Sequence, residues 1–270
     1  KKYGGHAFWD TELFMLSRFR LCGSPTTARH LESYSVPSAR RSEANAAKNG
    51  FQGAQYPWES ADDGSEQCPD WTIEPDGTCY RCYVAVYEHH VTAAVAFGIA
   101  KLRDHHRGYL VPIRSWCRDS HADRPFLGKP VRMEGRRRTT KSPQVTGPDE
   151  WHEPVDNNTY TNYLARWNMR YVIALVDRMQ REHPDDYAAL IAATGLTDAE
   201  LASWDAIQSK IYCPQGGHRP ARTVRGYFDL EPVTIEEYDK NDWPVRPAAL
   251  KQFKTSETQI IKQPDVVMLL

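Results

Sequence analysis

The 270-residue sequence predicts a mainly helical, all-α protein, because apolar residues recur at helical spacing in several segments while strand patterns are few and short. The clearest segment follows Asp156-Asn157-Asn158, a cluster whose side chains can cap a helix. Large apolar side chains then recur with a period of about 3.6 residues, at Tyr160, Leu164, Trp167, Tyr171 and Leu175. A long helix is therefore expected after residue 158.

A second helix is expected where Thr197-Asp198-Ala199-Glu200 forms a capping box. Its apolar face is predicted to carry Leu201, Trp204 and Ile211. Three further segments have helical patterns, which are residues 12–19, 38–49 and 88–101. The second of these is followed by Gly50, a residue that suits the turn after a helix.

Composition points to no nucleic-acid, membrane or metal partner. The formal net charge is −1, so no global field favours nucleic acid, and the run Arg136-Arg137-Arg138 lacks interleaved aromatic residues. No apolar leader follows Lys1, and no stretch is apolar and long enough to cross a bilayer. The six cysteines are scattered apart from Cys79 and Cys82, which favours reduced thiols in the cytoplasm and argues against a zinc site.

Two loops combine tryptophan with acidic residues, at 53–63 and 146–153. The sequence holds 8 Trp and 14 Tyr, and a flat aromatic ring can cover the apolar face of a sugar. In a single loop, Trp would simply anchor a turn. Several such loops at helix boundaries favour a site for a polyol on a helical scaffold.

Five motifs, in order along the chain, resemble glycoside hydrolase family 65. They are His6–Glu12, Pro57–Ser60, Gly147–His152, Val155–Asn162 and Ile261–Val267. That family holds maltose, kojibiose, nigerose and trehalose phosphorylases and some acid trehalases. The resemblance implies that residues 1–270 are part of a single (α/α)6 barrel. The β-sandwich and the C-terminal β-domain that flank it in complete members are expected to be absent, since the chain lacks an initiator Met and reads as a fragment.

The resemblance also implies a site and a reaction. Glu150 is the expected general acid, which must hold its proton near neutral pH. The residues expected to bind substrate are Trp9, Asp10, Lys262 and Gln263 for the transferred glucose, with Trp58 and Glu59 near the leaving sugar. Without the resemblance, Glu150 could equally be an ordinary carboxylate at a helix N-terminus.

The expected reaction is inverting phosphorolysis of an α-linked glucose disaccharide of the kojibiose, trehalose or maltose type. The products are β-glucose 1-phosphate and glucose, and inorganic phosphate is the co-substrate, with no cofactor or metal. Alternatives are a trehalase-like hydrolase that uses water and an inactive remnant or carbohydrate-binding protein. The family's phosphate-binding or base segment lies beyond Leu270, and relatives are commonly homodimers.

Two segments depart from the family pattern, at residues 102–144 and 213–225. Both resume it abruptly, at Val145 and Gly226. We hypothesise that they are translated out of frame; the alternative is a real divergent insertion. Sequencing of the locus tests this hypothesis.

Overall fold

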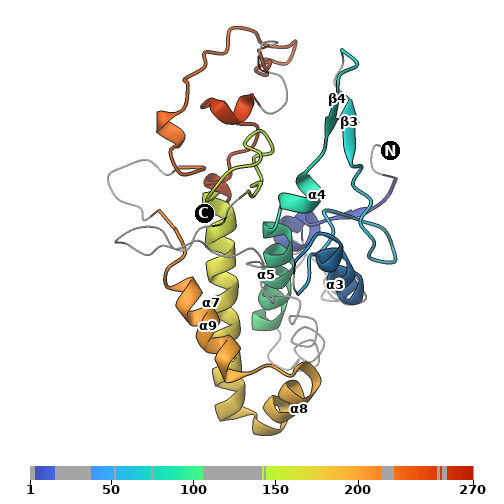
Figure 1. Ribbon diagram of the computed structural model, residues 1–270, viewed down its shortest axis with the longest axis vertical. Helices are drawn as coiled ribbons and strands as arrows, with labels where there is room; N and C mark the ends of the chain where they lie inside the picture. The colour runs from blue at the N-terminus through green and yellow to red at the C-terminus, as the bar shows by residue number, and fades with distance from the viewer. Residues whose placement is uncertain are drawn as a thin grey trace.

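The computed structural model describes most of the chain and is built mainly from helices (Figure 1). The described residues are 4–15, 38–51, 53–73, 76–105, 142, 144–214, 222–247, 250 and 254–269. Four of the helices form one packed unit, with a small hairpin and irregular loops at one end of it (Figure 1). The loops at that end carry the candidate site.

The longest helix, α7 (Thr159–Glu182), is the centre of the packing. It contacts α5 (His90–His105), α8 (Pro184–Thr194) and α9 (Asp198–Gln208). The side-chain oxygen of Asn158 accepts a hydrogen bond from the backbone N–H of Thr161 at 2.9 Å and so caps α7. The predicted helix after residue 158 is therefore confirmed, together with its cap.

The capping box predicted for the second helix is also present. Thr197 accepts from the N–H of Glu200 at 3.3 Å, and the Glu200 carboxylate accepts from the N–H of Thr197 at 3.0 Å. The helix ends at Gln208, so Ile211 lies beyond it and not on its apolar face as predicted. Ile211 is nevertheless buried, because the chain stays against α7 beyond the helix, where the next residue, Tyr212, accepts a hydrogen bond from Asn162 at 2.7 Å.

The core lies between the four helices. On α5 and α7 its members recur at helical spacing, so each helix turns one apolar stripe inward. They are Val91, Ala94, Val95 and Ile99 on α5, and Val172, Leu175, Val176 and Met179 on α7. Leu190 of α8 and Trp204 of α9 close the core.

The other described elements are one more helix, short helical turns and two strand pairs. Three of the turns are 3-10 helices, η3 (Tyr227–Asp229), η4 (Thr255–Glu257) and η5 (Val267–Leu269). The helix α3 (Ser38–Lys48) confirms the pattern at 38–49, and Gly50 after it has a φ of 79°. A one-turn π-helix, η1 (Thr11–Met15), covers the first part of the pattern at 12–19; residues 16–19 lie outside the described residues. The strands are β1 (Ala7–Phe8) with β2 (Glu59–Ser60), and β3 (Trp71–Ile73) with β4 (Cys79–Arg81), both antiparallel.

The helix predicted at 88–101 is present, but it begins two residues later, at His90, and a short helix precedes it. A four-residue helix, α4 (Val84–Tyr87), ends at Glu88, whose ψ of 65° is not helical, and α5 begins at His90. The prediction of a helical Glu88 is therefore wrong. At the break the carbonyl of Tyr87 accepts from the backbone N–H of Thr146 at 2.9 Å, and the N–H of Val91, which would bond to it in a continuous helix, donates to the carbonyl of Glu88 instead. This break orients Glu88 toward the candidate site.

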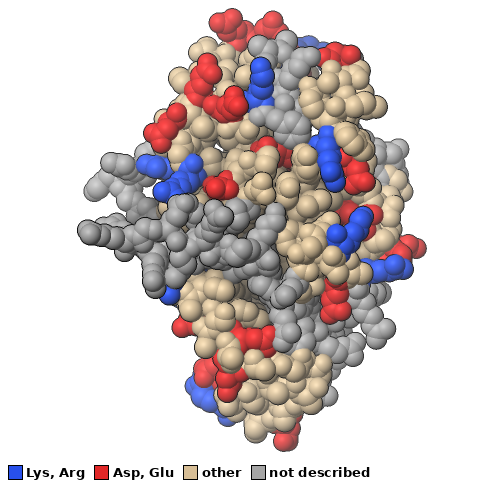
Figure 2. Space-filling view, in the orientation of Figure 1, with Lys and Arg blue, Asp and Glu red and all other residues tan. Residues whose placement is uncertain are grey.

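Other expectations concern the surface and the divergent segments. Acidic and basic side chains are interspersed over the face shown in Figure 2, in keeping with the net charge of −1. Among the described residues, no helix has the length and apolar character needed to span a membrane. Most of the two divergent segments, at residues 106–141 and 215–221, lies outside the described residues.

Candidate active site

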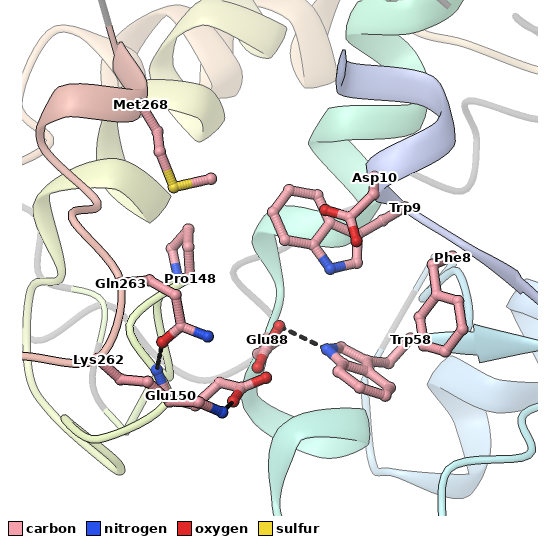
Figure 3. A pocket seen from close by; sticks show the side chains of 10 residues that line it. All are labelled: Phe8, Trp9, Asp10, Trp58, Glu88, Pro148, Glu150, Lys262, Gln263 and Met268. Carbon is pink, nitrogen blue, oxygen red and sulfur yellow. Dashed lines mark hydrogen bonds and ion pairs between the residues drawn. The ribbon is translucent and has the colours of Figure 1, made fainter. Parts of the chain in front are cut away.

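A pocket of about 300 Å³ opens where five chain segments meet (Figure 3). Its lining residues are Phe8, Trp9, Asp10, Trp58, Glu88, Pro148, Glu150, Lys262, Gln263 and Met268. Six of the seven residues expected from the sequence are in this set. They are up to 254 positions apart in the chain, from Trp9 to Gln263, and only the fold brings them together.

The loop that carries Glu150 is anchored at both of its ends. Its first part pairs with its last, as Val145 and Val155 exchange two backbone hydrogen bonds of 2.8 Å. The N–H of Thr146 also donates to the carbonyl of Tyr87 at 2.9 Å, at the break between α4 and α5. The position of Glu150 is therefore defined relative to the helical core.

Asp149 and His152 connect this loop to the loop that carries Lys262. Both side chains are fully buried, and Nδ1 of His152 lies 2.6 Å from Oδ2 of Asp149. The other ring nitrogen, Nε2, lies 2.9 Å from the carbonyl of Thr258, and Oδ1 of Asp149 accepts from the backbone N–H of Lys262 at 2.9 Å. Since both ring nitrogens face acceptors, His152 donates through both and is an imidazolium.

The pKa of His152 agrees with this assignment. Burial by itself would lower it, but the hydrogen bond and the negative charge of Asp149 outweigh burial, and the pKa lies above its usual value. The neighbouring Asp265 is also fully buried, and burial raises its pKa to about 7 against the opposing hydrogen bond from Asn158. The packing beneath the acid loop, the loop that carries Glu150, therefore depends on the protonation of His152 and Asp265.

Glu150 itself meets the second loop directly. Its Oε2 contacts Nζ of Lys262, and its backbone N–H donates to Oε1 of Gln263 at 3.2 Å. The Glu150 side chain is 23% exposed and the Lys262 side chain 47%, so both remain accessible from the pocket mouth. In Figure 3 the Glu150 carboxylate points into the pocket, toward the side lined by Glu88 and Trp58.

Glu59 does not line the pocket, although its neighbour Trp58 does. Successive residues of a strand point to opposite faces. Glu59 is buried on the other face, where its Oε1 lies 2.6 Å from Nδ1 of His6. Below the same loop, Glu66 accepts from the backbone N–H of Trp58 at 2.7 Å and of Glu59 at 3.1 Å. These bonds hold the loop that presents Trp58.

Sequence reasoning did not identify Glu88 as a site residue, yet it lies at the back of the pocket. Oε2 of Glu88 accepts a hydrogen bond from the indole N–H of Trp58 at 2.8 Å. Burial and then the charge of Glu150 raise its pKa well above the usual value, and the same two causes raise the pKa of Asp10. Raised carboxyl pKa values beside a cleft are one of the marks of a functional site, and they could be found only from the fold.

The described residues contain no cluster of three or more His, Cys, Asp or Glu side chains arranged for a metal ion. Cys82 does not pair with Cys79 but lies near Cys68, with 3.9 Å between the sulfur atoms. The pocket therefore offers carboxyl, ammonium, amide and indole groups. These groups suit a neutral polyhydroxy ligand, which needs several hydrogen bonds and an apolar wall.

The charged state of His152 predicts that the protein loses stability as the pH rises. A raised native pKa means that the native state holds the proton more tightly than the unfolded state. The contribution is complete below the ordinary value of about 6.5 and is lost as the pH rises through the raised pKa. Asp265 adds a loss of the same sign as the pH rises from its ordinary value toward about 7.

We expect the urea midpoint to fall between about pH 6 and about pH 8.5. His152→Asn is expected to be less stable at the lower pH and to show a smaller fall. Asp265→Asn serves as the matched control, since it removes the other titrating group and leaves the fall due to His152. Equal falls in the wild type and His152→Asn would contradict the assignment.

Comparisons with known proteins place the chain in a family. Residues 1–106 and 128–270 match the model of the glycosyl hydrolase family 65 central catalytic domain. The chain is 37% identical over 280 residues to a kojibiose phosphorylase of Caldanaerobacter subterraneus subsp. tengcongensis. The alignment covers 99% of this chain and 35% of that protein. A kojibiose phosphorylase of Thermoanaerobacter brockii is 35% identical, over 99% of this chain and 35% of that protein. An α,α-trehalose phosphorylase of the same organism is 26% identical, over 99% of this chain and 33% of that protein.

A solved structure from the human microbiome, provisionally assigned as a kojibiose phosphorylase, has the same fold. Its TM-score is 0.78 at 22% sequence identity, over 99% of this chain and 35% of that one. The described helices are therefore part of a helical barrel of this fold. The chain spans about a third of the length of the relatives that it matches.

Proposed function

The chain belongs to glycosyl hydrolase family 65, a family of glycoside phosphorylases and related enzymes, and on that premise we propose that it carries the acid and sugar-binding half of a disaccharide phosphorylase site. The proposed reaction is inverting phosphorolysis of an α-linked glucose disaccharide, which gives β-glucose 1-phosphate and glucose. One observation carries the proposal. Glu150 contacts Lys262 at the mouth of a pocket that Trp9 and Asp10 also line.

In the proposed mechanism, Glu150 donates a proton to the oxygen that bridges the two sugars. The bond from that oxygen to C1 of the transferred glucose breaks, and the leaving glucose departs with the proton. Phosphate attacks C1 from the opposite face, so the configuration inverts. The residues of this chain bind and orient the sugar, while the phosphate site is expected on a segment that follows these residues.

The sugar-binding roles follow from the chemistry of each side chain. Asp10 and Gln263 offer acceptors and donors for hydroxyl groups of the transferred glucose, and Lys262 offers three N–H donors. Trp58 presents an aromatic face. Its indole N–H donates to Glu88, and its ring packs edge-to-face against Phe8, with 5.1 Å between the ring centroids. Such a rigid wall suits the apolar face of the leaving sugar.

We propose kojibiose, the α-1,2-linked disaccharide, as the first substrate to test. The support is the identity of 35–37% to two kojibiose phosphorylases, against 26% to a trehalose phosphorylase. Side chains around the leaving sugar decide linkage, and Trp58 is a described residue that we assign to that side of the pocket.

The decisive experiment incubates the full-length gene product with kojibiose, trehalose, nigerose and maltose, each with and without inorganic phosphate. Phosphorolysis is expected for kojibiose, with β-glucose 1-phosphate and glucose formed in equal amounts only when phosphate is present. Release of two glucose molecules without phosphate would instead establish a hydrolase. No turnover of any disaccharide would leave a carbohydrate-binding protein as the function.

A further inference from the structure

Glu88 is the most deeply buried carboxyl group of the pocket. Its side chain is 2% exposed, and it follows the last residue of α4, where the non-helical backbone directs it into the space between Trp58 and Glu150 (Figure 3). The sequence motifs that point to this family do not include it. It is therefore a site residue without a role in the mechanism given above.

The two carboxyl oxygens of Glu88 differ in their partners. Oε2 accepts from the indole N–H of Trp58 at 2.8 Å. Oε1 is fully buried and has no hydrogen-bond partner within the described part of the chain. A buried polar atom normally has a partner, so an unpaired oxygen on a side chain that lines the pocket points to a ligand that supplies one.

The surroundings of Glu88 favour its neutral form. Its nearest basic group, Nε2 of His90, is 3.5 Å from Oε2. Burial lowers the pKa of His90 to about 3, so this ring is uncharged and does not balance a carboxylate. Burial, and then the negative charge of Glu150, raise the pKa of Glu88, with a smaller contribution from Glu153. A neutral acid with Oε2 occupied as acceptor carries its proton on Oε1, where it is available to donate.

The proposed function identifies the partner. Its phosphate site is expected on a segment that follows these residues, which leaves the neutral disaccharide as the ligand beside Glu88. A hydroxyl group of a neutral sugar can accept the O–H of Glu88 and donate to a carboxylate nearby. The position of Glu88 in the pocket lining, between Trp58 and Glu150, places that hydroxyl on the disaccharide.

We propose that Glu88 is a substrate-binding residue whose Oε1 donates a hydrogen bond to a hydroxyl group of the bound disaccharide while Oε2 fixes the indole of Trp58. The inference rests on the proposed function, since it takes a disaccharide as the ligand. It predicts that Glu88 acts as a donor, which a carboxylate cannot do. A site built around a buried donor discriminates strongly against a substrate that lacks the matching hydroxyl.

The test compares Glu88→Gln with Glu88→Leu in the full-length protein. Each is combined with Glu150→Gln, and the protein with Glu150→Gln alone is the parent, so that binding of kojibiose can be measured by calorimetry without turnover. Gln can accept from Trp58 and donate from its amide, so we expect its Kd to stay within about threefold of the parent. Leu offers neither group, and its Kd is expected to rise about 10- to 100-fold. Equal Kd values for the parent and Glu88→Leu would overturn the proposal.

Kojibiose analogues that each lack one hydroxyl separate a direct contact from a structural role. One analogue is expected to bind at least about tenfold more weakly to the parent and to Glu88→Gln, and with little further loss to Glu88→Leu. If every analogue is discriminated alike by all three proteins, Glu88 does not contact the sugar. The parent and Glu88→Gln suffice to locate that hydroxyl, so the test stays decisive even if Glu88→Leu folds poorly. If no analogue binds more weakly to both of these proteins, the proposal is overturned.

Parallel assays keep this inference separate from the proposed function. Wild-type protein that fails to phosphorolyse all four disaccharides contradicts the proposed function. Wild-type protein that is active, with Glu88→Leu unchanged in KM and kcat, contradicts the role of Glu88 alone.

Discussion

Replacing Glu150 by Gln is expected to lower kcat for phosphorolysis of kojibiose by about 10²- to 10⁴-fold, the range typical for removal of a general acid. Gln has nearly the same size and can still meet Lys262, so the Kd for the disaccharide is expected to change little. The measurement is steady-state kinetics of the full-length protein at saturating phosphate. The same substitution at an exposed carboxylate, Glu182→Gln on α7, is the matched control and is expected to leave kcat unchanged.

A second substrate tests whether the lost function is proton donation. α-Glucosyl fluoride has a leaving group that departs as an anion without needing a proton from the enzyme. Glu150→Gln is therefore expected to lose far less activity on the fluoride than on kojibiose. An equal loss on both substrates would contradict the role of acid and would point to a disturbed pocket.

Replacing Gly147 by Ala is expected to destabilise the protein by about 3 kcal/mol or more and to impair the site. A Cβ at this position would overlap the side-chain amide of Asn158 and would lie 2.6 Å from Oδ2 of Asp265. Neither neighbour can withdraw. Asn158 caps α7 and also donates to Asp265 at 2.6 Å, and both side chains are fully buried.

The effect of Gly147→Ala is measured as the shift in the urea midpoint, together with kcat for phosphorolysis. Gly77→Ala, in the turn of the β3–β4 hairpin, is the control. A Cβ there meets nothing within 4 Å, and only the positive φ of 84° opposes it, at a cost of about 1 to 2 kcal/mol. Gly77→Ala is expected to retain full kcat. A Gly147→Ala protein with wild-type stability and kcat would show that the acid loop does not depend on this contact.

The differences between sequence expectation and structure have physical causes. The helix pattern and its cap located α7, because they depend on residues that are near one another in the chain. The predicted start of α5 failed at Glu88, because the carbonyl of Tyr87 accepts from the backbone N–H of Thr146, far along the chain, and the helical ladder is interrupted there. The spacing of apolar residues along the chain contains no information about such a partner.

The same distinction applies to the site. Motifs that resemble one family named Trp9, Asp10, Trp58, Glu150, Lys262 and Gln263, and all six line one pocket. Glu59 was named with its neighbour Trp58, but the strand geometry turns it to the opposite face, against His6. Asp149 and His152 lie in the motif Gly147–His152 without an expected role, whereas their contacts show that they join two loops.

Periodicity, capping and motifs are local properties of the chain, so the amino-acid sequence was enough to predict the helical class, the caps of two helices and most of the residues that gather at the pocket. The fold was needed to show which carboxyl groups are buried together, which of them are pushed toward the neutral form, and that Oε1 of Glu88 has no hydrogen-bond partner among the described residues. Burial and the charge of distant neighbours set those properties, and both arise only when segments far apart in the chain come into contact.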